Sequence, residues 1–159
     1  MNNTICFLRT DAPRPIILIR VMVGSVFLSE GIQKFLEPAL RGAGRFERIG
    51  LPWPEFFGPF VGSVEIVCGL LILIGLFTRF ATVPLIGTML VAIFTTKIPI
   101  LLGTGFWGFS LRELSSYGFW SMAHESRTDF SMLLGSIFLL IVGAGPWSVD
   151  AKIVERKSE

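Results

Sequence analysis

Three charged side chains stand inside one long apolar stretch of the chain, residues 16–36: Arg20, Glu30 and Lys34. A charge surrounded by hydrocarbon costs several kcal/mol unless it is paired or hydrated. At about 100° per residue, Arg20, Gly31 and Lys34 fall within roughly 60° of the helical circumference, and Glu30 lies at the edge of this arc. The pattern predicts a polar face that points into protein. There a lysine could donate to a carbonyl oxygen and a buried carboxyl could relay a proton.

Two other arrangements of these charges are open. Glu30 and Lys34 are four residues apart, in the order that favours an ion pair on one helix. Arg20 and Lys34 also lie near the two ends of the stretch, so each could extend to the lipid headgroups instead. Glu30 has a shorter side chain and lies about 6 Å deeper than Lys34, which makes the headgroup interpretation weaker for it.

A second buried carboxyl is expected from Glu65, near the middle of another apolar stretch, residues 56–76. Gly58, Gly62 and Gly69 fall on the same side of that helix, and small residues let two helices approach closely in lipid. We therefore predict that Glu65 points into the bundle, and we take it as the candidate catalytic residue, a proton relay. A structural carboxyl, protonated or paired with a neighbouring helix, is the alternative.

The remaining candidate residues lie in the second half of the chain. Lys97 stands in an apolar stretch over residues 80–102 and could reach the headgroups or pair with an acid from another helix. A long loop over residues 103–127 is rich in aromatic side chains, which favours an interfacial belt or a lid across the mouth of the bundle. The simpler interpretation of a histidine there is a residue at headgroup level. The lid or proton-handling candidates are Trp107, Trp120, His124 and Glu125.

The composition is that of a membrane protein and excludes several kinds of site. Of 159 residues, 52% are hydrophobic and 16% are charged, with a net charge of +2. A soluble domain carries about 25% charged residues. The small net charge and the lack of a basic run argue against nucleic-acid binding. Cys6 and Cys68 have no metal-binding spacing, one histidine cannot form a bis-histidine haem site, and no phosphate-binding loop is present. We expect no metal, haem or nucleotide cofactor.

Helices that cross a bilayer must position these residues, and each needs about 20 apolar residues. We expect an all-α membrane protein, an antiparallel four-transmembrane-helix bundle over residues 16–150. Residues 1–15 would precede the bundle, and residues 151–159 would form a charged tail. Thr128 or Asp129 would cap the last helix. The expected spans are residues 16–36, 56–76, 80–102 and 128–146.

The loop over residues 37–55 carries three arginines at helical spacing, Arg41, Arg45 and Arg48. This pattern predicts an interfacial amphipathic turn that binds lipid headgroups, and a solvated linker is the alternative. An even number of spans places both termini on one side of the membrane. Lysine and arginine are nearly balanced between the two sides, with a weak preference for cytoplasmic termini. We expect a multi-pass protein of the cell inner membrane.

Several of these stretches together resemble the DoxX/DoxD family of small bacterial and archaeal membrane proteins. The matching pieces are Arg20 with Glu30-Gly31-x-x-Lys34-Phe35, Gly50-Leu51-Pro52, Glu65-x-x-x-Gly69, Gly75-Leu76-Phe77-Thr78-Arg79 and Gly145-Pro146-Trp147-Ser148-Val149-Asp150. Their order and spacing over residues 16–150 make the match specific. Trp147 departs from the small residue expected there, and the loop over residues 103–127 is the least family-like part.

The resemblance implies a four-helix membrane bundle. One branch of the family, DoxD, is the membrane subunit of a thiosulfate:quinone oxidoreductase, and other members are linked to redox complexes or have no assigned activity. We therefore expect a membrane subunit that works with a soluble or membrane redox partner, in an oligomeric state that the sequence leaves open. Its ligand would be a quinone or other lipophile. The predicted ligand-binding residues are Arg20, Glu30, Gly31, Lys34, Glu65 and Lys97.

Two other functions remain open at this point. In a non-catalytic membrane scaffold or assembly partner, the same charges would fix the register of the helices. Small-molecule transport is less favoured, because the chain shows no inverted repeat of broken helices.

Overall fold

The computed structural model describes residues 12–158, and the regular elements within that range are helical. The predicted N-terminal segment, residues 1–15, falls mostly outside the described residues, as does Cys6. The elements are α2 (Ile16–Leu36), α3 (Ala43–Ile49), α4 (Pro54–Ile74), α5 (Thr78–Ala92), the π-helical turn η1 (Ile93–Lys97), α6 (Ile98–Leu102), α7 (Phe119–Val142) and α8 (Val149–Ser158).

Three helical segments of the described chain are long and apolar enough to cross a bilayer: α2, α4 and the continuous run of α5, η1 and α6. The fourth long helix, α7, has 24 residues but carries Glu125, Arg127 and Asp129 in its first half. It is not among the segments that qualify by length and composition. The structure therefore shows an all-α protein with three candidate spans. The expected bundle of four transmembrane helices is not established.

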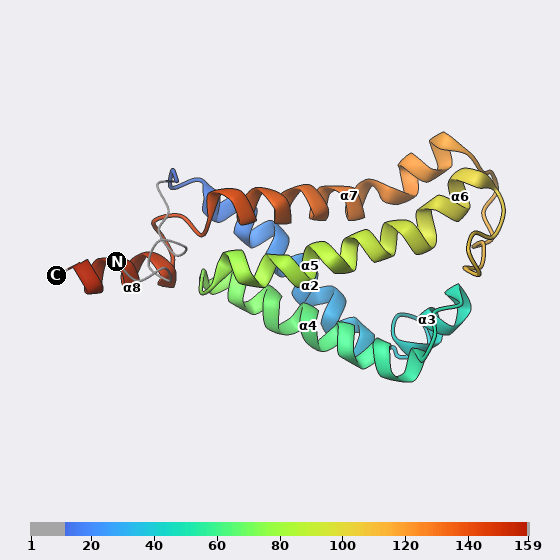
Figure 1. Ribbon diagram of the computed structural model, residues 1–159, viewed down its shortest axis with the longest axis horizontal. Coiled ribbons are helices and arrows are strands. Elements are labelled where there is room, and N and C mark those ends of the chain that lie inside the picture. The colour runs from blue at the N-terminus through green and yellow to red at the C-terminus, as the bar shows by residue number, and fades with distance from the viewer. Residues whose placement is uncertain (1–11, 159) are drawn as a thin grey trace.

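The long helices run beside one another in alternating directions (Figure 1). Helix α2 packs chiefly against α4, and α5 packs chiefly against α7, while α4 and α5 are joined by a short turn and also touch. The helices lie close together at the end where α8 begins. They separate at the opposite end, where α3 and the loop after α6 are found (Figure 1). The two helix pairs therefore leave space between them at one end only.

Glycines set the distance between α2 and α4. A Cβ atom on Gly31 would lie 2.7 Å from the carbonyl oxygen of Gly62, and one on Gly24 would lie 2.9 Å from that of Gly69. Neither contact tolerates a side chain, so the two backbones approach more closely than larger residues would allow. The predicted small-residue face of α4 is confirmed, because its members are all buried: Gly58, Gly62, Glu65 and Gly69.

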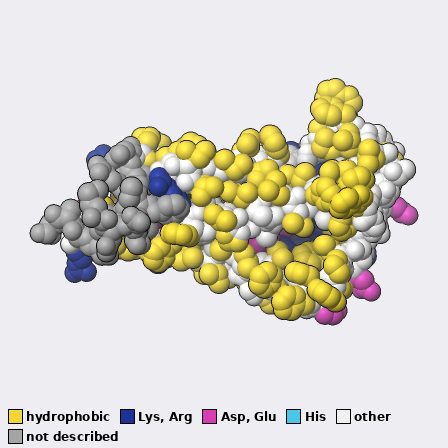
Figure 2. Space-filling model, viewed as in Figure 1, with side chains coloured by type: hydrophobic (Ala, Val, Ile, Leu, Met, Phe, Trp, Pro, Cys, Tyr) yellow, Lys and Arg dark blue, Asp and Glu magenta, His cyan; other side chains and the backbone are white. Residues whose placement is uncertain are grey.

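The apolar side chains divide between a core and an outer surface. Val23, Phe27, Ile72, Leu85 and Leu139 are almost completely buried between the helices. Many other large apolar side chains of the long helices are exposed, and Figure 2 shows hydrophobic side chains over much of the visible face. An apolar outer surface of this extent is expected of helices that pack against lipid rather than water.

The last long helix begins earlier than expected. Its first residue is Phe119, preceded by Gly118 as the N-cap at φ 109°, so the loop before it covers only residues 103–118. The prediction that Thr128 or Asp129 caps this helix was wrong, since both lie in its interior. The charged run that suggested a helix start is instead part of a helix whose polar side chains are partly exposed.

The C-terminal segment also differs from its expected form. Residues 151–159 were expected as a charged tail, but the chain forms the helix α8 from Val149 to Ser158. At the other boundaries the differences are small: α4 begins at Pro54 and α5 at Thr78, each two residues earlier than expected. Proline suits the first position of a helix, because its missing N–H would have no partner there.

Candidate functional site

A buried ion pair joins α2 to α4. The Nζ atom of Lys34 lies 2.5 Å from Oε2 of Glu65, and the two side chains are only 8% and 4% exposed. Lys34 lies one turn beyond Gly31, whose close contact with Gly62 brings the two helices together at this level. The structure therefore places Gly31, Lys34 and Glu65 together, at the interface between the first two long helices.

Lys34 forms its ion pair with Glu65 on α4, although Glu30 lies one turn away on its own helix. The expected ion pair with Glu30 does not form: Lys34 Nζ contacts only the backbone oxygen of Glu30, at 3.5 Å. Within the described residues, the Glu30 carboxylate makes no ion pair, and its side chain is half-buried. Glu30 repels the Glu65 carboxylate electrostatically, whereas the guanidinium of Arg45 attracts it. Lys34 is the short-range partner that neutralises Glu65.

A second ion pair joins the α5–α6 run to α7. Lys97 Nζ lies 2.9 Å from Oδ2 of Asp129, with side-chain exposures of 8% and 23%. Lys97 ends the π-helical turn η1, and Pro99 follows two residues later. Proline has no N–H for the usual helical bond and its ring clashes with the preceding turn, which accounts for the wider helical turn at this point. The sequence left two possibilities for Lys97, the lipid headgroups or an acid from another helix. In the structure, Lys97 pairs with an acid from another helix.

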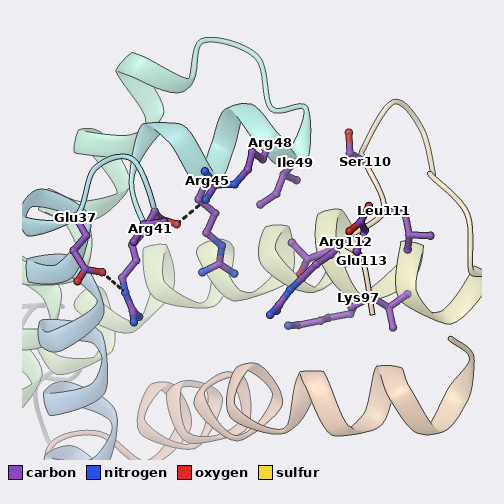
Figure 3. Close-up of a pocket in the computed structure, with 13 residues that line it drawn as sticks. Glu37, Arg41, Arg45, Arg48, Ile49, Lys97, Ser110, Leu111, Arg112 and Glu113 are labelled. Atoms are coloured by element: carbon purple, nitrogen blue, oxygen red, sulfur yellow. Dashed lines mark hydrogen bonds and ion pairs between the residues drawn. The ribbon is translucent and has the colours of Figure 1, made fainter. Parts of the chain in front are cut away.

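The space between the helix pairs forms a cavity of about 630 Å³ at the open end of the molecule. Figure 3 shows the α3 side and the side formed by η1, α6 and the following loop facing each other across it. Lys97 is the one predicted ligand-binding residue among the residues that line it. The lining residues are Glu37, Leu40, Arg41, Arg45, Arg48, Ile49, Thr96, Lys97, Ile100, Ser110, Leu111, Arg112 and Glu113.

Arg20 lies apart from these groups. It is 14 residues before Lys34 on α2, which corresponds to about 21 Å along the helix axis. Its guanidinium is buried and donates to backbone oxygens of Ile72 (2.9 Å), Leu73 (2.6 Å), Ala144 (3.1 Å) and Trp147 (2.6 Å). These contacts connect α2 to the end of α4 and to the segment after α7. Arg20 is not among the residues that line the 630 Å³ cavity, and its role in ligand binding stays a prediction.

Asp150 completes the polar cluster at this closed end. Its carboxylate accepts hydrogen bonds from the backbone N–H groups of Phe77 (2.8 Å) and Thr78 (3.1 Å), at the start of α5. Its own backbone N–H donates to the carbonyl oxygen of Gly75 at 2.9 Å. Asp150 therefore caps α5 from a distant part of the chain, and it ties together two of the sequence motifs at residues 75–79 and 145–150.

Three of the four predicted lid residues, Trp120, His124 and Glu125, line one small cavity, and Trp107 is not among its lining residues. Trp107 and Trp120 are each 83% exposed. Glu125 accepts an ion pair from Arg112 at 3.1 Å, which attaches the loop before α7 to that helix, and His124 is exposed beside Arg127. A smaller cavity of about 310 Å³ is lined by Leu114, Ser115, Ser116, Trp120, Ser121, His124 and Glu125.

Sequence reasoning missed two contributors to this site. Asp129 was taken for a helix cap, although the unmatched charge of Lys97 was a signal that an acid from another helix was needed. Arg112 carried no signal, because nothing in the sequence shows that its loop folds back toward the arginines of residues 37–49. Neither residue belongs to the motifs that suggested a family.

A family model named DoxX matches residues 16–98. The chain belongs to the DoxX family. The resemblance drawn from the sequence motifs is therefore confirmed. The match covers the Lys34–Glu65 pair and ends just beyond Lys97, so in this DoxX protein the acid partner of Lys97 and the loop wall of the cavity lie outside the matched region.

Two relatives extend the comparison over nearly the whole chain. "Uncharacterized membrane protein Rv3486" of Mycobacterium tuberculosis is 53% identical over 149 residues, which are 94% of this chain and 87% of the relative. "Putative oxidoreductase CatD" of Bacillus subtilis is 28% identical over 142 residues, 89% of this chain and 88% of the relative. No solved structure matches the chain. The family, the three apolar helices and the first relative's name agree on a membrane protein.

Proposed function

We propose that this DoxX protein is a membrane subunit of a redox complex and binds a quinone or other lipophile in the cavity between its helix pairs. The observation that carries this proposal is the cavity itself. Its volume of about 630 Å³ lies within the range of roughly 300–1,000 Å³ found for small-molecule sites. Apolar side chains and the donors of Lys97 and Arg45 line the same space. The oxidoreductase name of the Bacillus subtilis relative supports the redox part.

The proposed reaction, reduction of a quinone, needs a hydrogen-bond donor and a source of protons at the site. Reduction of a quinone to a quinol consumes two electrons and two protons, and we assign the electrons to a partner subunit. Lys97 would donate a hydrogen bond to a quinone carbonyl oxygen, and charge-assisted donors of this kind are the stronger ones. Glu65 would relay protons toward the cavity. It is a buried carboxyl near the middle of α4, and Arg45 on the cavity wall attracts it electrostatically.

Replacing Lys97 by methionine should weaken quinone binding by about tenfold or more, since a hydrogen bond to a charged group contributes roughly 1.5–3 kcal/mol. The measurement is titration of a short-chain ubiquinone analogue into protein held in lipid nanodiscs, followed by tryptophan fluorescence. Lys152→Met is the matched control, because Lys152 is an exposed lysine on α8. Equal affinity in Lys97→Met and the unaltered protein would contradict this placement of the quinone.

A non-catalytic scaffold is the second candidate function, and one observation favours it. The ion pairs Lys34–Glu65 and Lys97–Asp129 each connect two different helices. Buried charges that pair between helices can serve to fix register alone, with no chemistry. Under this function, charge-neutral replacement of Glu65 would leave the activity of any complex containing the protein unchanged.

We also propose that α7 is the fourth span, that both termini are cytoplasmic, and that the membrane is the cell inner membrane. With 24 residues, α7 is about 36 Å long, enough to cross a hydrocarbon core of about 30 Å. Its most costly charge, Asp129, is paired with Lys97. The helix begins at the open end and ends beside the start of α2 (Figure 1).

The topology leads to opposite expectations for two reporter positions. Green fluorescent protein fused after Glu159 should fluoresce, because it would stay in the cytoplasm. Alkaline phosphatase inserted after Ser115, in the loop before α7, should be active, because that loop would be periplasmic. If α7 does not cross, the two positions lie on the same side, and the two reporters could not both be active.

A further inference from the structure

More basic than acidic side chains line the cavity. Its lining carries five basic side chains and two acidic ones: Arg41, Arg45, Arg48, Lys97 and Arg112 against Glu37 and Glu113. Some of this charge is already balanced. Arg41 pairs with Glu37 at 2.8 Å, Lys97 with Asp129, and Arg112 with Glu125. Arg45 and Arg48 form no ion pair among the described residues, although Arg45 attracts the Glu65 carboxylate over a longer distance, and Arg48 donates to backbone oxygens of Ala39 and Leu40. Two arginines outside these ion pairs, against the single carboxylate of Glu113, leave a net positive charge in the cavity.

Arg45 is the group that most needs a ligand. It lies on α3, is half-buried, and projects into the cavity in Figure 3. Within the described part of the chain, its guanidinium makes no hydrogen bond or ion pair, although it offers five N–H donors. The ends of Arg112 and Lys97 enter the same space from the opposite side (Figure 3). Three cationic groups from segments far apart in the sequence therefore converge on one volume.

The arrangement of these groups favours a phosphate oxyanion. Guanidinium groups present a planar fork of donors that matches phosphate oxygens in a bidentate way, and two of the three converging groups are arginines. The cavity is several times larger than a phosphate group, and apolar side chains also line it: Leu40, Ile49, Ile100 and Leu111. A ligand that matches both the basic and the apolar side chains of the cavity has a phosphate group and an apolar part.

The position of the cavity agrees with such an amphiphile. It lies at the end of the spans, between the point where α2 ends at Leu36 and the loop after α6. In a bilayer crossed by these helices, that end would lie at the level of the lipid headgroups, where basic pockets between helices recognise anionic lipids. Figure 2 shows Lys and Arg side chains in a hollow bordered by hydrophobic ones on this part of the molecule.

We infer that the cavity binds the phosphate group of an anionic phospholipid, with Arg45 and Arg112 as its principal donors. The apolar lining residues contact the acyl chains of this lipid. A zwitterionic lipid such as phosphatidylcholine also has a phosphate, but its ammonium group would meet the remaining positive charge and be repelled. This inference goes beyond the quinone-linked role and does not require it, because the lipid could fix the separation of the two helix pairs in a scaffold as well.

The test compares lipid binding in nanodiscs of phosphatidylcholine with and without phosphatidylglycerol. We expect phosphatidylglycerol to raise the unfolding temperature and to be retained in native mass spectrometry. Arg45→Gln and Arg112→Gln should each weaken this retention by about tenfold, because each removes a charged donor. Arg127→Gln, an exposed arginine on α7 outside the cavity lining, is the matched control and should bind like the unaltered protein.

Folding and ligand source are checked separately. Arg45 makes no hydrogen bond or ion pair to the described protein, so Arg45→Gln should keep the unfolding temperature measured in phosphatidylcholine alone. Retention of phosphatidylglycerol that is equal in all variants would overturn the inference. Inorganic phosphate that stabilises the protein in phosphatidylcholine discs at millimolar concentration and displaces phosphatidylglycerol would overturn the lipid source and assign the cavity to soluble phosphates.

The same discs separate this inference from the proposed function. Quinone binding that is insensitive to phosphatidylglycerol, with no preferential retention of the anionic lipid, would reject the lipid site and keep the quinone proposal. Retention of phosphatidylglycerol without measurable quinone binding would support the lipid site and reject the quinone proposal.

Discussion

Glu65→Leu should destabilise the protein by about 3–5 kcal/mol, because it leaves the Lys34 ammonium buried without the carboxylate that neutralises it. The two atoms of this pair are 2.5 Å apart and the side chains are almost fully buried, so water cannot replace the lost partner. Lys34→Met should cost a similar amount, by leaving Glu65 unpaired beside the like charge of Glu30. The measurement is denaturant unfolding of each purified variant in the same detergent.

The double variant Lys34→Met/Glu65→Leu decides whether the charge is the cause. Replacing a whole buried ion pair by apolar residues of similar size is often neutral, so the double variant should recover most of the stability that either single change removes. Glu37→Leu is the matched control, since its pair with Arg41 is about half exposed and should contribute less than about 1 kcal/mol. A double variant as unstable as the single ones would show that shape, not charge, holds α2 against α4.

Glu65→Gln separates the two candidate functions. Glutamine keeps the size of the side chain and can accept the hydrogen bond from Lys34, so this variant should fold far better than Glu65→Leu. It cannot carry a proton. If Glu65 is a relay, membranes containing the whole complex should lose quinone-linked turnover while the variant still binds the quinone. Full turnover in Glu65→Gln would reject the relay and favour the scaffold.

The face of each helix could be predicted from the sequence because it depends on periodicity alone. The glycines at positions 58, 62 and 69 and the carboxyl of Glu65 share one side at 3.6 residues per turn, and all are buried as predicted. The same reasoning assigned the polar side of α2, where Arg20, Gly31 and Lys34 are all buried. The number of spans was harder to predict, because α7 carries three charged side chains in its first half and is not among the helices apolar enough to qualify as candidate spans.

The partners of the charges could not be predicted, because they depend on which helices become neighbours. On one helix, Glu30 is the natural partner of Lys34, but the glycine contact between α2 and α4 brings Glu65 closer. The cavity was missed for the same reason. Its walls come from residues 37–49 and 96–113, which are brought together only by the packing of α2 on α4 and of α5 on α7.

Arg20 gives the second large expected effect. Arg20→Met should destabilise the protein by at least about 3 kcal/mol, since hydrogen bonds to a charged group contribute roughly 1.5–3 kcal/mol each and this guanidinium donates four of them in a buried site. Arg20→Lys should recover only part of this loss, because an ammonium is a compact group that lacks the planar fork needed to reach oxygens on two separate segments. Thermal and denaturant unfolding of the purified variants measure both effects.

Arg14→Lys is the matched control, because Arg14 is an exposed arginine just before α2 and should tolerate lysine with little change. Quinone binding in Arg20→Lys then separates a structural from a ligand-binding role. Arg20 lies about 21 Å along α2 from Lys34. Its guanidinium donates hydrogen bonds to backbone oxygens of α4 and of the segment after α7. Folded Arg20→Lys should therefore bind quinone with unchanged affinity. Loss of quinone affinity in a variant of undiminished stability would return Arg20 to the ligand-binding role predicted from the sequence, and would place the ligand at the closed end of the helices.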